Sequence, residues 1–140
     1  MTQSEKMWIA RITAPVCLLA MGGTLYYLLE ILMRGWSHWT MAVCGGLCLL
    51  FIYYVNCRFT HLSLLLRAIL STVIITAVEL TAGCLLNIGL GLAIWNYSQH
   101  RFNLLGQISL YASARWLLLS IPVCIGCRWV ERHVFDPNVW

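Results

Sequence analysis

Charged residues are scarce in this chain. Nine Lys and Arg and five Asp and Glu make only 10% of its 140 residues, whereas a soluble domain has about 25%. Hydrophobic residues make 61%, and the mean hydropathy is +0.78. A soluble fold of this composition would expose large apolar patches. The composition therefore excludes an ordinary soluble domain and indicates one integral membrane domain, residues 1–140.

Short motifs of several enzyme classes are also missing. The chain has no His-Glu-x-x-His, no Gly-x-Ser-x-Gly and no Gly-x-x-x-x-Gly-Lys-Ser/Thr phosphate loop. These motifs bind zinc, carry a nucleophilic serine and bind the phosphates of ATP, respectively. His38 and His100 have no carboxylate-rich neighbours in sequence. No basic cluster alternates with aromatics, as a nucleic-acid site would require. We therefore expect no enzyme, no cofactor, no metal site and no nucleic-acid partner.

Four apolar runs dominate what is present, at residues 12–33, 39–55, 68–91 and 104–127. A spanning helix needs about 17–25 residues, and none of the runs alternates as a membrane β-strand does. The sequence predicts an all-α fold, a bundle of four transmembrane helices. The first run is too long for the core of a cleavable signal peptide, so we expect it to be retained as a helix.

Lysine and arginine set the expected orientation. With four spans, the N-terminus, the segment after the second run and the C-terminus share one side of the membrane. That side holds six basic residues, and the other side holds two, Arg34 and Arg101. The positive-inside rule then predicts cytoplasmic termini. We expect a multi-pass protein of a bacterial plasma membrane, in contact with membrane lipids. The six residues are Lys6, Arg11, Arg58, Arg67, Arg128 and Arg132.

Small residues recur within the apolar runs. Gly22 and Gly23 in the first run, and a second glycine pair at residues 45–46, are of the kind that lets helix backbones approach closely in lipid. Seven cysteines lie mostly inside these runs, where free cysteine packs as a small hydrophobe. Cys124 and Cys127 form Cys-x-x-Cys, but no second pair stands at zinc-like spacing. We expect packing roles for the cysteines.

Two polar stripes with a step of four stand out in the last two runs. The first stripe is Glu79, Gly83, Asn87 and Gly91, and the second is Asn103, Gln107, Tyr111 and Arg115. A step of four marks one row on a helix surface. If the chain folds back between the stripes, Arg115 lies level with Glu79 and Gln107 with Asn87. Both charges would then stand about 11 residues along their helices, near mid-membrane.

The matched depth predicts a buried ion pair between Glu79 and Arg115, because a charge in hydrocarbon is costly unless it is paired or lines a polar path. Above the pair, amides and aromatics at the bundle mouth form a candidate polar pocket for a polar or cationic solute. The same amides could instead clamp the loop by interhelical hydrogen bonds. The pocket residues are Asn87, Asn103, Gln107, Tyr111, Trp95 and Tyr97.

Three motifs in residues 75–120 carry a family resemblance. They are Glu-x-x-x-Gly at residues 79–83, Trp-Asn-Tyr-Ser at residues 95–98, and Asn-Leu-Leu-Gly-Gln-Ile at residues 103–108, with Trp116 beyond. This pattern resembles the bacterial membrane family of putative ABC-transporter permeases, type IV. This chain has Asn96 where the family pattern has Asp. The resemblance implies a permease-like transport component.

Three functions remain open from the sequence. The chain could be a transport component that acts as an oligomer or with partner subunits, since four helices do not readily enclose an aqueous path. It could be a structural or accessory membrane subunit whose Glu79–Arg115 pair only fixes helix packing. An intramembrane enzyme is the least supported, because no catalytic constellation is visible. A polar pocket that joins Glu79 to the loop at residues 95–103 would favour transport.

Overall fold

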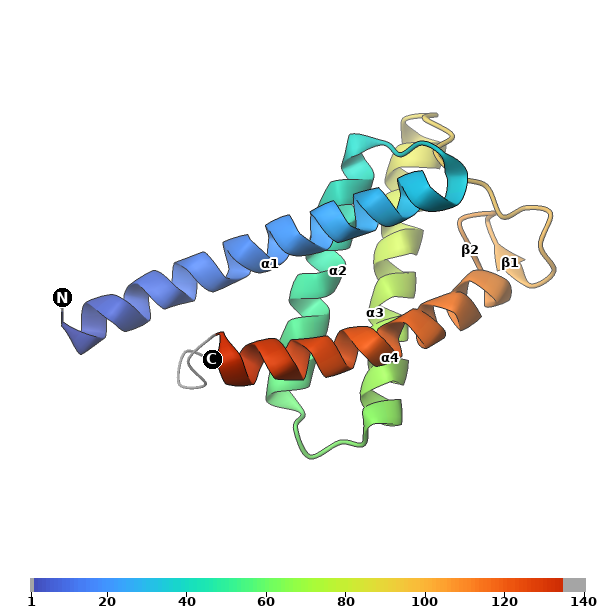
Figure 1. Cartoon of the computed structure of the whole chain (residues 1–140). Helices are drawn as coiled ribbons and strands as arrows, with labels where there is room; N and C mark the ends of the chain where they lie inside the picture. The colour runs from blue at the N-terminus through green and yellow to red at the C-terminus, as the bar shows by residue number, and fades with distance from the viewer. Residues whose placement is uncertain (1, 135–140) are drawn as a thin grey trace.

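The computed structural model describes residues 2–134 (Figure 1), so the expected domain, residues 1–140, extends past the described residues at both ends. The helices are α1 (Gln3–Arg34), α2 (Trp39–Arg58), α3 (Leu64–Ala82) and α4 (Leu110–His133). A π-helical segment, η1 (Gly83–Gly89), continues α3, and β1 (Asn103–Leu104) pairs with β2 (Ile108–Ser109) in a small antiparallel hairpin. The all-α prediction is confirmed.

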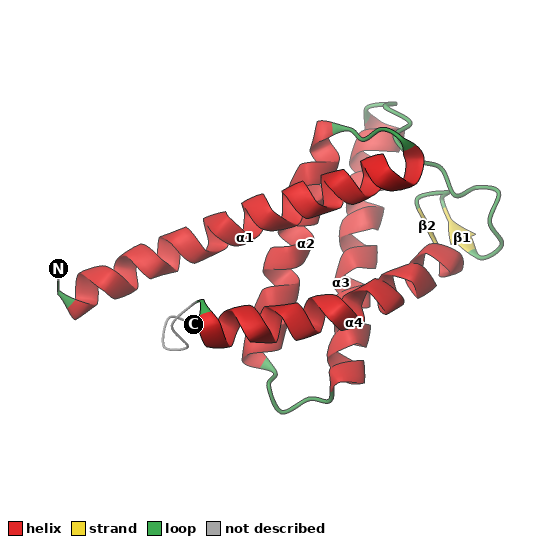
Figure 2. Ribbon diagram, viewed as in Figure 1, coloured by secondary structure: helices red, strands yellow, loops and turns green. Residues whose placement is uncertain are grey.

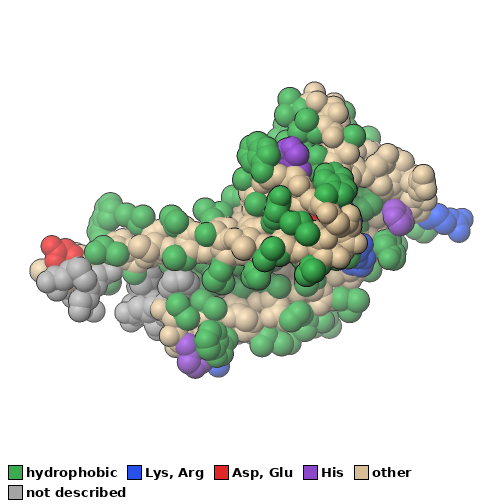
Figure 3. All heavy atoms as spheres, turned by 45° about the horizontal axis from the view of Figure 1, so that its top comes forward, with side chains coloured by type: hydrophobic (Ala, Val, Ile, Leu, Met, Phe, Trp, Pro, Cys, Tyr) green, Lys and Arg blue, Asp and Glu red, His purple; other side chains and the backbone are tan. Residues whose placement is uncertain are grey.

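Four helical segments are long and apolar enough to cross a membrane: Met7–Arg34, Trp39–Arg58, Leu64–Gly89 and Leu110–His133. The first three agree with the sequence analysis to within a few residues. Large hydrophobic side chains remain exposed on the described part of the chain, with Leu32 at 84% and Leu118 at 71%. Figure 3 shows apolar side chains spread over the visible face of the helices. Such a surface suits contact with lipid.

The fourth span begins at Leu110, later than the predicted residue 104. Leu105 and Gly106 adopt left-handed φ angles of 54° and 68°, so no right-handed helix passes through them. Ser109 is extended and caps α4, accepting a 3.1 Å hydrogen bond from the Ala112 amide. Asn103 and Gln107 therefore lie in the hairpin, and the predicted second helical stripe is wrong in its first half.

Helices α1 and α2 touch backbone to backbone at their glycines. A Cβ on Gly23 would stand 2.6 Å from the Ala42 carbonyl oxygen, and one on Gly46 would stand 2.5 Å from that of Leu19. Both distances are far below van der Waals contact, so only glycine permits this approach. In lipid, where apolar burial drives little association, such close packing is a main source of helix–helix affinity.

Helix α2 is the central element of the bundle, because it contacts α1, α3 and α4. Figure 2 shows α2 and α3 side by side, with α1 and α4 crossing them. Asn56, wholly buried on α2, accepts a 2.9 Å hydrogen bond from Arg67 Nη1 and lies 3.4 Å from Cys124 Sγ. All seven cysteines are free, and Cys124 and Cys127 belong to the core, as their expected packing role requires.

Candidate functional site

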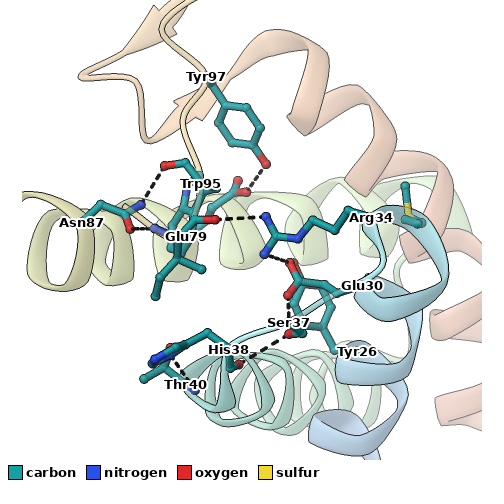
Figure 4. A network of polar contacts seen from close by, with 12 residues as sticks. Tyr26, Glu30, Arg34, Ser37, His38, Thr40, Glu79, Asn87, Trp95 and Tyr97 are labelled. Carbon is teal, nitrogen blue, oxygen red and sulfur yellow. Dashed lines mark hydrogen bonds and ion pairs between the residues drawn. The ribbon is translucent and has the colours of Figure 1, made fainter. Parts of the chain in front are cut away.

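Glu79 lies on α3, inside the third span, and both of its carboxylate oxygens accept hydrogen bonds. The Tyr97 hydroxyl donates to Oε1 at 2.8 Å, and the Trp116 indole N–H donates to Oε2 at 3.1 Å. Burial raises the pKa of Tyr97 above its usual value, and the negative charge of the neighbouring Glu79 carboxylate raises it further. The hydroxyl therefore remains a donor at neutral pH. Two neutral groups therefore solvate the half-buried carboxylate, and Figure 4 shows the Tyr97 hydroxyl pointing toward it.

The predicted ion pair between Glu79 and Arg115 does not form. Among the described residues the ion pairs are Glu30–Arg34 and Arg128–Glu131. Arg115 Nη2 lies 3.6 Å from Met33 Sδ, and its guanidinium stands over the Tyr111 ring at 5.8 Å. The late start of α4 is the cause. Arg115 lies five residues, about 7–8 Å, inside the span, whereas Glu79 lies about 15 Å from Gly89.

Helix α1 supplies a polar row that the sequence analysis did not join to the site. Arg34 Nη2 lies 3.0 Å from Glu30 Oε1, and Arg34 Nη1 donates to the Ile94 carbonyl at 3.1 Å. Glu30 also accepts from the Ser37 hydroxyl and, at 3.4 Å, from the Tyr26 hydroxyl. Tyr26, Glu30 and Arg34 are four residues apart, so the signal that marks the Glu79 stripe was present here too.

The predicted meeting of Asn87 with Gln107 does occur, but as a clamp between η1 and the hairpin. Asn87 Nδ2 donates to Gln107 Oε1 at 2.8 Å and to the Trp95 carbonyl at 3.1 Å, while Asn87 Oδ1 accepts from the Ile94 amide at 2.7 Å. The Trp95 indole donates to the Gln107 carbonyl at 3.0 Å. Gly83 leaves the space that Gln107 fills, since a Cβ there would stand 2.6 Å from Gln107 Oε1.

A cavity of about 660 Å³ opens between α1, α4 and the loop after η1. We call it the polar cavity. It is large enough for a small solute, since ligand pockets measure about 300–1,000 Å³. Glu79 lines it together with loop residues, so one continuous space joins this carboxylate to the segment at residues 95–100. Its polar and aromatic lining consists of Tyr26, Glu30, Arg34, Glu79, Trp95, Asn96, Tyr97, His100, Arg115 and Trp116.

A second cavity of about 320 Å³ lies between the four helices, and we call it the apolar cavity. Its walls are aliphatic and aromatic, with Leu25, Ile52 and Val123 among them. The two cavities share Glu79 and Met41, as well as the rings of Tyr26, Trp95 and Trp116. Glu79 therefore stands where a polar space meets an apolar one.

The six predicted pocket residues divide into three groups. Trp95 and Tyr97 line the polar cavity. Asn87 and Gln107 form the clamp behind it. Asn103 and Tyr111 are exposed: Asn103 donates to the His100 carbonyl at 2.8 Å, and the Tyr111 ring stacks on that of His100 at 5.0 Å. The structure therefore does not bring all six together around this cavity. Tyr26, Glu30, Arg34 and Trp116 line it too, and the sequence analysis did not name them for the pocket.

The loop that closes the site is held in costly backbone conformations. Ala93 and Phe102 have left-handed φ angles of 49° and 56°, like Leu105, and such residues cluster at functional sites. The Gly106 carbonyl accepts a 2.7 Å hydrogen bond from the Tyr97 amide. A Cβ on Gly106 would stand 2.5 Å from Ser98 Oγ. Asn96 accepts from the Ser98 amide at 2.8 Å. These contacts fix the position of Tyr97 over Glu79.

Within residues 2–134, no three His, Cys, Asp or Glu side chains come together as a metal site. A family model described as putative ABC-transporter type IV matches residues 27–136. No curated protein and no solved structure matches the chain. The matched region contains every residue that lines the polar cavity except Tyr26.

Proposed function

Because the chain belongs to the family described as putative ABC-transporter type IV, we propose that it is a small transport component of a membrane, acting with copies of itself or with partner subunits. Its role is to bind a solute and pass it on. The chain has no phosphate loop for ATP, so any energy from ATP enters through a partner. We propose the bacterial plasma membrane as its location, with a binding and not a catalytic function.

One observation carries this proposal: the polar cavity reaches Glu79. A carboxylate that served only packing would be sealed by its neighbours. Glu79 instead lines a space of about 660 Å³ that also contacts Asn96 and His100, both exposed loop residues. An ionisable residue in a membrane span that faces a cavity is a mark of a solute path.

The proposed orientation places both termini in the cytoplasm, on the count of basic residues. Arg34 and Arg101 then lie on the opposite side, with the loop that rims the polar cavity. The cavity opens away from the cytoplasm in this orientation. A solute arriving from outside the cell would meet Asn96, Tyr97 and His100 first and Glu79 last.

The alternative is an accessory subunit, and a specific observation favours it. Asn87, Gln107 and the Trp95 indole form a self-sufficient clamp, in which the amides bond within the chain. Such a clamp stabilises the loop whether or not a solute binds. In that case a partner subunit, and not a solute, would cover the cavity.

Solute binding to the purified full chain separates the two functions. Trp95 and Trp116 line the polar cavity, so their fluorescence reports on its occupation. Detergent-solubilised protein is titrated with a panel of amines, carboxylates, amino acids, sugars and inorganic ions, and thermal unfolding is followed in parallel. We expect one class to change the fluorescence and raise the Tm, and both effects to weaken in Glu79→Gln. Glu131→Gln, which alters the distant pair with Arg128, is the matched control. If no member of the panel has either effect, the accessory function replaces the proposal.

A further inference from the structure

The charges that line the polar cavity balance, but they do not all cancel locally. The cavity has four charged residues: Glu30, Arg34, Glu79 and Arg115. Glu30 and Arg34 form an ion pair at 3.0 Å. Glu79 and Arg115 make no ion pair with any described residue. One negative and one positive charge therefore face the same space without a counter-charge in contact.

Glu79 is prepared for a cation. Its oxygens accept from a tyrosine and an indole, which hold the carboxylate in position but leave its charge uncancelled. The rings of Tyr26, Trp95 and Trp116 stand around it in both cavities, with Tyr26 and Trp116 5.8 Å apart between centroids. A carboxylate attracts an ammonium group by Coulomb interaction, and aromatic rings that line the same cavity add a cation–π attraction.

Arg115 is prepared for an anion. Its neighbours are the Met33 sulfur at 3.6 Å and the Tyr111 ring at 5.8 Å, and neither is charged. A guanidinium has five N–H donors, so donors remain for a carboxylate, which it can bind through two parallel hydrogen bonds. The residue is exposed at the rim of the cavity, whereas Glu79 is half-buried at its inner end.

A ligand with one charge would satisfy only one of these residues and would be repelled by the other. A zwitterion satisfies both. The apolar cavity adds a further requirement, because it adjoins Glu79 and is lined by residues such as Leu25, Ile52 and Val123. An apolar group attached beside the ammonium would enter it and leave water.

We infer that the joined cavities bind a small zwitterion with an apolar substituent, its ammonium at Glu79, its carboxylate at Arg115 and its substituent in the apolar cavity. This inference rests on the proposed transport function and names its substrate class. An α-amino acid with an aliphatic side chain has this chemistry, as does its N-trimethylated form.

Four analogues of one skeleton test the three parts of the inference on the native full chain. They are L-leucine, 3-methylbutylamine, 4-methylpentanoate and glycine, of which the last three lack the carboxylate, the ammonium and the apolar substituent, respectively. N-trimethyl-leucine is a second zwitterion. Tryptophan fluorescence and thermal unfolding measure binding. We expect a zwitterion with the isobutyl group to bind on the order of tenfold more tightly than each deletion analogue.

Substitutions at two residues assign the charges. Glu79→Gln should weaken the zwitterion on the order of tenfold and leave 4-methylpentanoate unchanged. Arg115→Gln should weaken the zwitterion similarly and leave 3-methylbutylamine unchanged, while Arg115→Lys recovers part of the affinity. Arg101→Gln is the control, since Arg101 is exposed and lines neither cavity.

The analogue series needs no variant, so a misfolded variant does not weaken the test. If either singly charged analogue binds as tightly as L-leucine or more tightly, the site does not require a zwitterion. If glycine binds as tightly as L-leucine, the site does not require the apolar substituent. If neither zwitterion binds while another class of the solute panel does, the inference fails and the proposed function stands. If nothing binds, both fail.

Discussion

The Tyr97 hydroxyl and the Glu79 carboxylate are joined by a hydrogen bond of 2.8 Å. Tyr97 belongs to the loop after η1, and Glu79 to the middle of the third span. The bond therefore ties the rim of the polar cavity to its deepest polar group. In the proposed function, a ligand cation would share this carboxylate with the Tyr97 hydroxyl.

Tyr97→Phe should lower the free energy of unfolding by about 1–2 kcal/mol, because it removes a half-buried hydrogen bond to a carboxylate. Thermal unfolding in detergent measures the change. Tyr54→Phe is the control, since Tyr54 is 52% exposed and makes no hydrogen bond in the described structure. Equal melting of Tyr97→Phe and the parent protein would contradict the role given to this bond.

The same residue predicts a dependence on alkaline pH. Since burial raises the folded-state pKa of Tyr97 above its ordinary value of 10.0, the hydroxyl stabilises the fold fully below about pH 10. That stability is lost as the pH rises above 10, because the unfolded chain ionises first. The difference in stability between the parent protein and Tyr97→Phe should therefore shrink above this pH. A difference that stays constant into the alkaline range would exclude the assigned cause.

Asn87→Leu and Gln107→Leu should each lower the Tm, because each leaves buried partners of the clamp unsatisfied. Their joint replacement should cost less than the sum, with a coupling of about 0.6 kcal/mol, the average for interhelical hydrogen bonds in membranes. Gln99→Leu is the control on the exposed part of the same loop. Additive effects in the double variant would show that the amides do not act together.

Gly46→Ala should destabilise the α1–α2 pair strongly, because its Cβ would stand 2.5 Å from the Leu19 carbonyl oxygen. Overpacking of this kind costs about 1–3 kcal/mol. Gly126→Ala offers the matched control in α4, where nothing lies within 4 Å of the new Cβ and a helix gains about 1 kcal/mol from the exchange. The two variants should shift the Tm in opposite directions. Similar shifts would mean that the glycine contact does not hold the pair.

Cysteine labelling in intact cells tests the proposed orientation. A membrane-impermeant thiol reagent should label Gln99→Cys, in the loop at the cavity rim, and should miss Thr60→Cys, between α2 and α3. Both positions are exposed, so access to the reagent decides the result. The unsubstituted chain serves as the background for its seven cysteines. Labelling of Thr60→Cys but not of Gln99→Cys would show the opposite orientation, with the polar cavity open to the cytoplasm.

The sequence by itself determined the membrane class and the four spans. Hydropathy acts over some twenty residues at a time, so these features need no knowledge of distant contacts. The Glu-x-x-x-Gly, Trp-Asn-Tyr-Ser and Asn-x-x-Gly-Gln-Ile motifs likewise indicated the family that the match over residues 27–136 shows. The expected meeting of Asn87 with Gln107 also occurs, but through the hairpin and not through a second helix.

Only the tertiary structure decided which groups surround Glu79. The step of four at residues 103–115 looked helical, yet the left-handed Leu105 and Gly106 break it into a hairpin and a later helix. That shift places Arg115 at the rim of the polar cavity, so the Glu79 carboxylate accepts its hydrogen bonds from Tyr97 and Trp116 instead. Spacing along a chain predicts neighbours on one helix, but the partners of a buried charge come from elements 18 and 37 residues away. Their approach depends on how the loop and helices pack, which no local pattern in the sequence encodes.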